Sequence, residues 1–475
     1  MAAWFGLLST KGIGGGIALM VDVVIFAGFL AICVLTVIEL RLMRVGNLSF
    51  SDGVLIGAVY YVVLPLLVLL MTGELADVNL HVPPYRPYAD VSTTLNLFLG
   101  LVVVLLFHAV CRLFPKGPLA SVPERTEKVS FRVFFIVLVV LEVANFFVSG
   151  KSAGGHWADN ASAAFSQSPI AIFSLGIANC WRTCAFGYLA YRTVTGRISR
   201  RSATIIGALV VVLDVTLTFN RITVAYYIMM IALLYRDRIL LIGTGLVVLA
   251  PTVTFMSSVW AVFRGLALSR GVSVENILMA LQTASTSSQG AEGGISKTLN
   301  AFAEATNLLV FKFLVENVPD HFSPLWGSTF ILKTFSFFIP STIWEDKPKT
   351  FGTYLGYYVE SIQGLTLNST LFGEAYGNFY YYWPFALFAM LCVIEFLFRR
   401  VANLAPVYGF FGAFVAIALW RFDMTFAFIS FVTIGVVHVL VGAGLWFSSL
   451  KVGGRSYAVA DRRVRRNMNR IKTPR

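Results

Sequence analysis

The sequence predicts an all-α, polytopic membrane protein with about 11 transmembrane helices and one large extracytoplasmic loop. Hydrophobic residues make up 57% of the 475 residues and charged residues only 13%, a composition that excludes an ordinary soluble domain. Apolar runs long enough to cross a bilayer recur along the chain. Most of the 37 Lys and Arg residues fall on alternate loops, and this pattern marks the cytoplasmic side.

The region 1–260 is predicted to form about eight of these helices. Their apolar runs lie at 17–38, 54–73, 95–111, 133–149, 169–191, 203–219, 222–235 and 239–260. The first run ends at a segment that contains two arginines, so the amino terminus is expected on the periplasmic side. No basic leading segment precedes that run, which argues against a cleaved signal peptide.

The region 380–450 is predicted to form the last helices, at 380–398, 405–420 and 425–447. An odd number of spans places the basic tail at 451–475 in the cytoplasm. A polybasic cytoplasmic tail is expected to bind anionic membrane lipid rather than nucleic acid.

The loop at 261–379 cannot be absorbed into spans, and we interpret it as the working part of the protein. Its segments 273–283 and 297–316 have helical periodicity, whereas 325–339 and 351–362 are aromatic, half-apolar and too short to span. The last two are expected at the interface or in protein-lined space, because irregular backbone cannot face lipid unsatisfied. The mixture of aromatic, carboxylate, amide and cationic groups suits a surface that binds a polar, ring-shaped ligand.

Common catalytic and metal-binding motifs are absent from the sequence. The five cysteines lie in or beside apolar runs without a Cys-x-x-Cys pair, so neither a disulfide framework nor a zinc site is indicated. There is also no His-x-x-x-His pair, no Walker loop and no Gly-x-Ser-x-Gly motif. A metal hydrolase, an ATPase and a serine hydrolase are therefore disfavoured, and neither a metal nor a cofactor is expected.

Three arginines are expected near the outer boundary of the membrane. Arg221 lies about 15 residues before Arg236, or roughly 22 Å of helix, which is less than the hydrocarbon thickness of about 30 Å. Arg264 and Arg421 lie at the outer ends of other predicted helices. Arginine binds phosphate bidentately, so a lipid-linked diphosphate is a suitable ligand. Snorkelling of each arginine to lipid headgroups is the alternative.

Arg182 and Asp214 fall inside consecutive predicted spans. Charged groups at this depth are costly unless they are paired. A structural ion pair is the preferred interpretation, and a proton or ion relay is the alternative.

Several polar groups of the large loop have catalytic potential. His321, Lys347 and Glu374 are set among aromatic residues and glycines, whereas Lys349 and Glu360 are typical of solvated loop charges. A carboxylate or a histidine can take a proton from a sugar hydroxyl, and a cation can stabilise a departing phosphate.

The order of the predicted helices and four short segments resemble the Wzy-type polymerases of bacterial surface polysaccharides. This family includes polymerases of O-antigen and exopolysaccharide repeats, and the enterobacterial common antigen polymerases are the most similar. The segments are Phe219-Asn-Arg-Ile222, Val262-Phe-Arg-Gly265, Phe338-Ile-Pro-Ser-Thr-Ile-Trp-Glu-Asp-Lys-Pro348 and Ser369-Thr-Leu-Phe-Gly373. The resemblance implies a GT-C-like glycosyltransferase of the inner membrane that joins undecaprenyl-diphosphate-linked oligosaccharide repeats at the periplasmic face, without a nucleotide sugar or a metal.

The resemblance also implies roles for individual residues. Diphosphate binding is expected from Arg221, Arg264 and Arg421, with Lys347 assisting, and sugar binding from Trp344, Tyr354, Tyr376 and Asn378. The general base for the acceptor hydroxyl is expected to be His321 or Glu374. The expected partners are the lipid-linked substrate, membrane lipid and a regulator protein that sets chain length.

Two other functions remain open at this stage. An O-antigen ligase would transfer finished chains to a lipid core and would use the same diphosphate chemistry. A lipid or solute transporter would need polar sites in mid-membrane, for which Arg182 and Asp214 are the best support.

Overall fold

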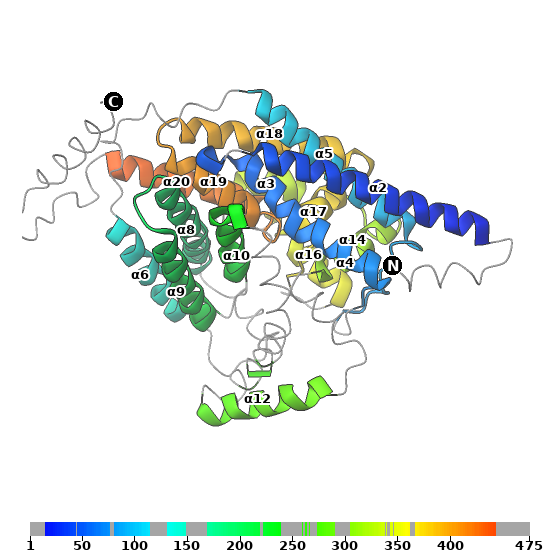
Figure 1. The fold of residues 1–475 in the computed structure, drawn as a ribbon, viewed down its shortest axis with the longest axis horizontal. Coiled ribbons are helices and arrows are strands. Elements are labelled where there is room, and N and C mark those ends of the chain that lie inside the picture. Colours follow the sequence, from blue (N-terminus) through cyan, green and yellow to red (C-terminus); the bar gives the residue numbers. More distant parts are fainter. Residues whose placement is uncertain are drawn as a thin grey trace, which may run out of the picture.

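The computed structural model describes residues 15–43, 45–76, 80–114, 131–148, 169–218, 222–238, 259, 262–263, 266, 273–289, 305–337, 339, 343–344, 346–361 and 366–442. Within these residues the regular structure is helical, and one antiparallel bridge joins Leu75 to Tyr85. The described chain is therefore all-α, as the sequence predicts (Figure 1).

The helices before the large loop coincide with the predicted apolar runs. They are α2 (Gly15–Leu42), α3 (Phe50–Ala58), the π-helical turn η2 (Val59–Val63), α4 (Leu64–Thr72), α5 (Val91–Leu113), α6 (Phe131–Val148), α8 (Pro169–Val194), α9 (Arg200–Thr218) and α10 (Ile222–Leu234). Helices α3 and α4 form one continuous rod through η2. The span predicted at 239–260 lies almost entirely outside the described residues.

Three of these helical rods are long and apolar enough to cross a membrane: Met20–Leu42, Phe50–Thr72 and Val91–Leu113. Helix α2 also exposes aliphatic side chains such as Met20, Leu30 and Val34, and such a surface is suited to lipid rather than water. The protein is thus membrane-associated. Shorter apolar helices at Ile222–Leu234, Val407–Ala418 and Thr425–Gly435 belong to the same assembly, and the full set of about 11 spans remains a prediction.

The three C-terminal helices are α18 (Trp383–Ala402), α19 (Val407–Ala418) and α20 (Thr425–Gly442). Helix α19 is buried along its whole length, with α3 and α8 as its main neighbours. Glycines allow this close packing, because a Cβ at Gly53 would lie 1.9 Å from the carbonyl oxygen of Ala413 and one at Gly187 would lie 2.8 Å from that of Phe410.

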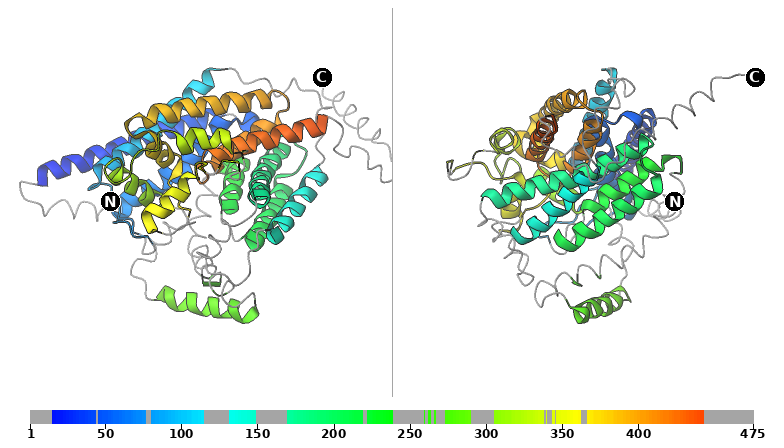
Figure 2. Two further views of the ribbon diagram at one scale, coloured as in Figure 1. Left: turned by 180° about the vertical axis from the view of Figure 1, so that it is seen from behind. Right: turned by 90° about the vertical axis from the view of Figure 1, so that its left-hand side faces the viewer.

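The large loop contributes two structurally different parts. Helix α12 (Val274–Gln289) extends the predicted helix at 273–283 and lies apart from the helical bundle in every view (Figures 1 and 2). The second part comprises α14 (Thr306–Asn317), a π turn η6 (Ser328–Leu332), α15 (Lys333–Ser336), α16 (Phe351–Glu360) and α17 (Thr370–Phe379). These elements share the main hydrophobic core with α5 and α18.

Helix α17 was not expected from the sequence. Residues 370–378 are all buried, and the helix packs against α14 and α18. Gly377 faces the Phe351 ring of α16, with only 2.4 Å from the position of an added Cβ to that ring. Helix α17 is consequently a buried element of the core, whereas the sequence placed this segment in a surface loop.

Candidate functional site

Backbone strain is concentrated around α17. The non-glycine residues with positive φ among those described are Trp326, Ser361, Thr370 and Tyr380, all between positions 326 and 380. Thr370 (φ 64°) and Tyr380 (φ 48°) stand at the two ends of α17. Such conformations cost about 1–3 kcal/mol each, persist only where the surrounding packing enforces them, and are frequent at functional sites.

Helix α17 carries a buried carboxyl group, that of Glu374, which is 3% exposed. Its Oε2 accepts a hydrogen bond of 2.9 Å from the backbone N–H of Met424, just before α20. Its Oε1 has no hydrogen-bond partner within the described part of the chain. Burial, and secondly the nearby carboxylate of Asp423, raises the pKa of Glu374 well above its usual value of 4.5.

Asp423 lies at the N-terminal end of α20 and is partly buried. Burial raises the pKa of this carboxyl group, while the positive charge of Lys333 and hydrogen bonds at the start of α20 lower it. Lys333 begins α15, which packs against α20 through the rings of Phe335 and Phe428, 4.7 Å apart. A lysine and two carboxyl groups therefore meet where α15, α17 and α20 converge.

Lys347 joins this group from the segment after α15. Its Nζ donates to the carbonyl oxygens of Phe337 (2.8 Å) and Ile339 (2.6 Å), so it is held at the end of α15. Burial, reinforced by the charge of Lys333, lowers the pKa of Lys347 to about 8. We call Lys333, Lys347, Glu374 and Asp423 the outer cluster, because the predicted orientation places it on the periplasmic side.

Arg421 lies on the turn between α19 and α20, two residues before Asp423, and is partly buried. Asn368 links this turn to α17: its Nδ2 donates to the Trp420 carbonyl (3.2 Å) and its Oδ1 accepts from the Thr370 N–H (3.0 Å). Arg421 also lies close enough to the Tyr226 hydroxyl of α10 to act on it electrostatically. The predicted ligands Arg221 and Arg264 lie outside the described residues.

The residues expected to bind sugars are distributed between the core and the surface. Tyr376 is buried against the rings of Phe311, Tyr380 and Trp383, and burial raises its pKa to about 12. Asn378 is fully buried, and its amide bonds to the Phe330 N–H, the Thr329 hydroxyl and the Glu374 carbonyl. Trp344 and Tyr354 are partly buried, and His321 is exposed on the turn after α14. Sugar binding and base catalysis by these residues remain predictions.

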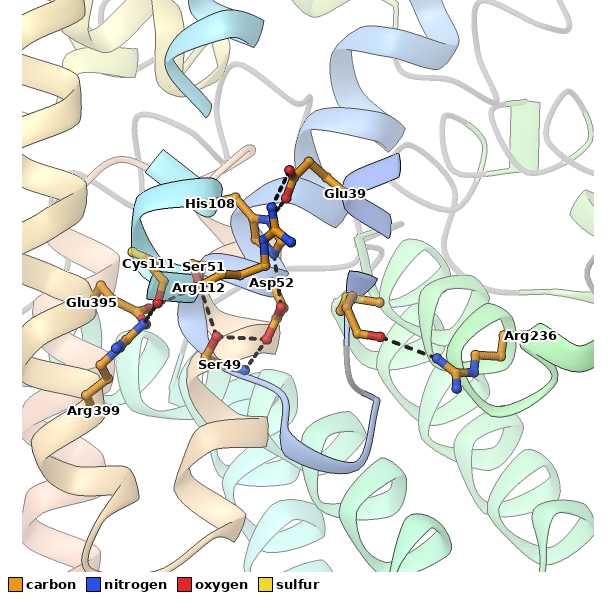
Figure 3. Close-up of polar contacts among 11 residues, drawn as sticks. Glu39, Ser49, Ser51, Asp52, His108, Cys111, Arg112, Arg236, Glu395 and Arg399 are labelled. Atoms are coloured by element: carbon orange, nitrogen blue, oxygen red, sulfur yellow. Dashed lines mark hydrogen bonds and ion pairs between the residues drawn. The ribbon is translucent and has the colours of Figure 1, made fainter. Parts of the chain in front are cut away.

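We call a second polar group the inner network, because the predicted orientation places it near the cytoplasmic side; it is centred on His108 and Asp52 (Figure 3). Fully buried His108 on α5 contacts Glu39 Oε2 through Nδ1 (2.7 Å) and Asp52 Oδ1 through Nε2 (3.1 Å). The inner network contains the carboxylates of Glu39, Asp52 and Glu395, and both oxygens of each have a partner. Glu39 contacts Arg112 and His108, and Asp52 contacts Ser49 and His108. Glu395 contacts Arg399 and the Ser51 N–H. The inner network ties α2, α3, α5 and α18 together.

Arg182 forms a third polar group and is 1% exposed. It pairs with Asp214 at 3.0 Å, as the sequence predicts, and also with Glu142 through hydrogen bonds of 2.7 and 2.8 Å. Asn179 accepts a further bond from the guanidinium, and Thr223 donates to Asp214. All three guanidinium nitrogens are engaged, which supports a structural role for this ion cluster in α6, α8 and α9.

Sequence reasoning missed Lys333 and Asp423. The available signal for Asp423 was its position directly before an apolar run, where aspartate caps a helix, and two residues after Arg421. No local signal pointed to Lys333, because its proximity to Asp423 is a tertiary contact.

Comparisons of the chain with protein-family models, with curated proteins and with solved structures find no match. Within the described residues no group of three or more His, Cys, Asp and Glu side chains is arranged to hold a metal ion.

Proposed function

We propose that this protein polymerises undecaprenyl-diphosphate-linked oligosaccharide repeats into a bacterial surface polysaccharide at the outer face of the inner membrane. The observation that carries the proposal is the outer cluster at the junction of α15, α17 and α20, in which Lys333 lies near Asp423, Asp423 lies near Glu374, and Lys347 lies near Lys333. Its setting is a membrane-associated bundle, with aromatic side chains close by. Cations for a diphosphate and rings for a saccharide meet the two needs of such a substrate.

The proposed reaction transfers a glycan from undecaprenyl diphosphate to a hydroxyl group of the acceptor sugar. The acceptor oxygen bonds to the anomeric carbon, the bond from that carbon to the diphosphate oxygen breaks, and the hydroxyl proton passes to a base. The departing diphosphate gains negative charge, which Lys333 and Lys347 stabilise, with Arg421 nearby. Because diphosphate is already a good leaving group, cationic side chains suffice for its departure.

Glu374 acts in this proposal as a positioning residue. Its carboxyl group lies below the protein surface and binds the Met424 N–H, which fixes the backbone next to Asp423. The half-buried lysines and Asp423 are the groups that substrate can reach. Substitution of Glu374 should therefore weaken catalysis through the geometry of Asp423 rather than through direct loss of a substrate contact.

The test uses purified protein in liposomes with lipid-linked repeats extracted from source cells that lack the protein. We expect a ladder of extended chains on a gel. Lys333→Ala should slow extension by about 100-fold, as does loss of one donor to a developing anion in other enzymes. Lys349→Ala is the matched control, because Lys349 is an exposed lysine two residues from Lys347 and should behave like the unmodified protein.

The rival functions give different outcomes in the same experiment. A ligase would build no ladder from lipid-linked repeats alone and would need a second lipid acceptor. A transporter would move substrate across empty liposomes without extending it. Long chains of normal abundance from the Lys333→Ala protein would contradict the role of the outer cluster.

A further inference from the structure

Helix α16 has an unusual exposed face. Its buried residues Phe351, Leu355 and Val359 recur every four positions and face the core. The opposite side carries Tyr354, Tyr357 and Tyr358, which are three or four residues apart and share one side of the helix. We call these three residues the tyrosine face.

The exposed side chains of the tyrosine face are aromatic, whereas those along α2 are mainly aliphatic. Tyr357 is 52% exposed and Tyr358 is 46% exposed, whereas α2 exposes aliphatic residues such as Leu30 and Val34. Rings packed nearly perpendicular to each other fix both tyrosines: Tyr357 and Tyr358 are 5.7 Å apart, and Tyr358 and Phe322 are 4.6 Å apart. Fixed rings that carry hydroxyl groups combine apolar stacking with hydrogen bonding.

A histidine and a glutamate mark one end of this face. Glu360, the last residue of α16, accepts from the His81 backbone N–H (2.9 Å), and its other oxygen contacts His81 Nδ1 (2.6 Å). The Glu360 side chain is 6% exposed, whereas that of His81 is 86% exposed. The buried carboxylate thus fixes one ring nitrogen of His81, while most of the imidazole surface stays exposed.

The other charged residues that the structure describes in the loop carrying His81 have partners of their own. Arg86 pairs with Glu74 (2.8 Å), its N–H donates to Asp90 (2.7 Å), and Asp90 faces Lys312 of α14 (3.8 Å). Glu360 is therefore the charged partner of His81 among the described residues. The hydrogen bond from the His81 backbone N–H to Glu360 is enough to anchor the loop. The second contact, from Nδ1 to the same carboxylate, therefore serves to orient the imidazole ring.

Helix α16 connects the tyrosine face to the neighbourhood of the candidate site. Helix α16 starts against α17, where the Phe351 ring meets Gly377, one turn beyond Glu374. Glu360 and His81 lie at the far end of α16, about 13 Å along its axis. This separation is too long for a group that acts on the reacting bond and suits one that binds sugars further along the glycan.

We propose that the tyrosine face, together with His81, is a saccharide-binding subsite for the sugars of the lipid-linked substrate that are remote from the reacting bond. The tyrosine rings stack on sugar faces, and His81 exchanges hydrogen bonds with sugar hydroxyls while Glu360 positions it. The inference rests on the proposed function and extends it from the diphosphate to the glycan. The exposed hydroxyl-bearing rings and the oriented imidazole favour a carbohydrate over lipid as the occupant.

The test measures binding separately from extension. Mild acid releases free oligosaccharide from the extracted lipid-linked repeats, and its binding to the purified protein is followed by saturation-transfer NMR. We compare Tyr357→Phe/Tyr358→Phe, which keeps both rings, with Tyr357→Leu/Tyr358→Leu, which keeps only apolar character. The Leu pair should weaken oligosaccharide binding and raise KM by about tenfold or more with little change in kcat, because two rings that stack on sugar faces are lost. The Phe pair should stay within about threefold of the unmodified protein.

His81→Ala should also weaken binding, and Glu360→Gln should have a smaller effect of the same sign. Glu74→Gln, which alters an exposed ion pair of the same loop, is the matched control and should leave binding unchanged. Equal behaviour of the Leu and Phe pairs would overturn the subsite and indicate an interfacial aromatic surface. A normal ladder with unchanged KM in the Leu pair would refute the subsite alone, whereas no ladder from the unmodified protein would refute the proposed function and the subsite with it.

Discussion

The inner network and the outer cluster contain the same kinds of side chains, but their carboxyl oxygens differ in whether each has a hydrogen-bond partner. In the inner network both oxygens of Glu39, Asp52 and Glu395 have partners (Figure 3). In the outer cluster, Glu374 keeps one buried oxygen without a partner among the described residues. Buried polar groups that serve only the fold are normally saturated, whereas unsatisfied groups with shifted pKa values gather at functional sites. The contrast holds for the carboxyl groups, since in the inner network the unsatisfied buried atom among the described residues is the Nε of Arg112.

The largest expected effect comes from breaking the inner network at its centre. His108→Leu removes the partner of Glu39 Oε2 and of Asp52 Oδ1 in a fully buried position. Leaving buried carboxylates without their partner should lower the free energy of unfolding by about 3–5 kcal/mol. Denaturant unfolding in detergent micelles measures the change, with Glu74→Gln as the exposed control. A loss below about 1 kcal/mol would show that the network is not a structural tie.

An intermediate effect is expected from glycines next to the two regions. At Gly53, beside Asp52, an added Cβ would meet the backbone of Ala413, which cannot move aside. At Gly377, one turn beyond Glu374, the obstacle is the far end of the Phe351 ring, which can turn. Gly53→Ala should therefore destabilise by about 3 kcal/mol and Gly377→Ala by about 1 kcal/mol.

Thermal unfolding of the two glycine variants ranks them directly. Gly435→Ala is the reference, because no atom lies within 4 Å of its added Cβ and alanine is the better helix former. If Gly377→Ala proved the more damaging, the outer region would be the more rigid of the two.

The smallest expected change in stability comes from Glu374→Gln. Because the pKa of Glu374 is raised in the folded state, the folded protein binds a proton that the unfolded chain releases above about pH 4.5. Stability should fall as the pH rises from 4.5 through the raised value, since that window favours the deprotonated, unfolded chain. Glutamine mimics the protonated acid, so the variant should stay within about 1 kcal/mol of the unmodified protein at neutral pH.

A pH series of unfolding midpoints tests this expectation. The fall with rising pH should be shallower in Glu374→Gln, and the remaining slope should come from Asp423, whose pKa burial also raises. A Glu374→Gln variant with the same slope as the unmodified protein would mean that Glu374 is ionised in the folded state.

Much of the helical framework could be predicted, because an apolar run of span length identifies a helix without knowledge of its neighbours. The pairing of Arg182 with Asp214 was also accessible, since the two residues lie on consecutive helices. The third member of this ion cluster, Glu142, could not be assigned, because nothing in its local sequence distinguishes it from a charge at the end of a predicted span.

The candidate site was only partly accessible from sequence. Lys347 and Glu374 were recognised from their aromatic and glycine-rich surroundings. The burial of α17 comes from α14, α16 and α18, and the approach of Lys333 to Asp423 joins residues 90 positions apart, so neither is encoded in a local pattern. The tyrosine face has a clear helical spacing, but its meaning depends on the contact of Glu360 with His81.

The π turn η2 has a consequence for the rod formed by α3 and α4. A π turn contains one residue more than an α turn, and one residue corresponds to about 100° of rotation around the axis. Within the π turn the rotation per residue is smaller, so deletion of a single residue between Val59 and Val63 would restore regular α-helix and leave Leu66 and Leu69 facing the core. The turn thus absorbs one surplus residue, so a one-residue change of length at this point need not disturb the packing of either half of the rod.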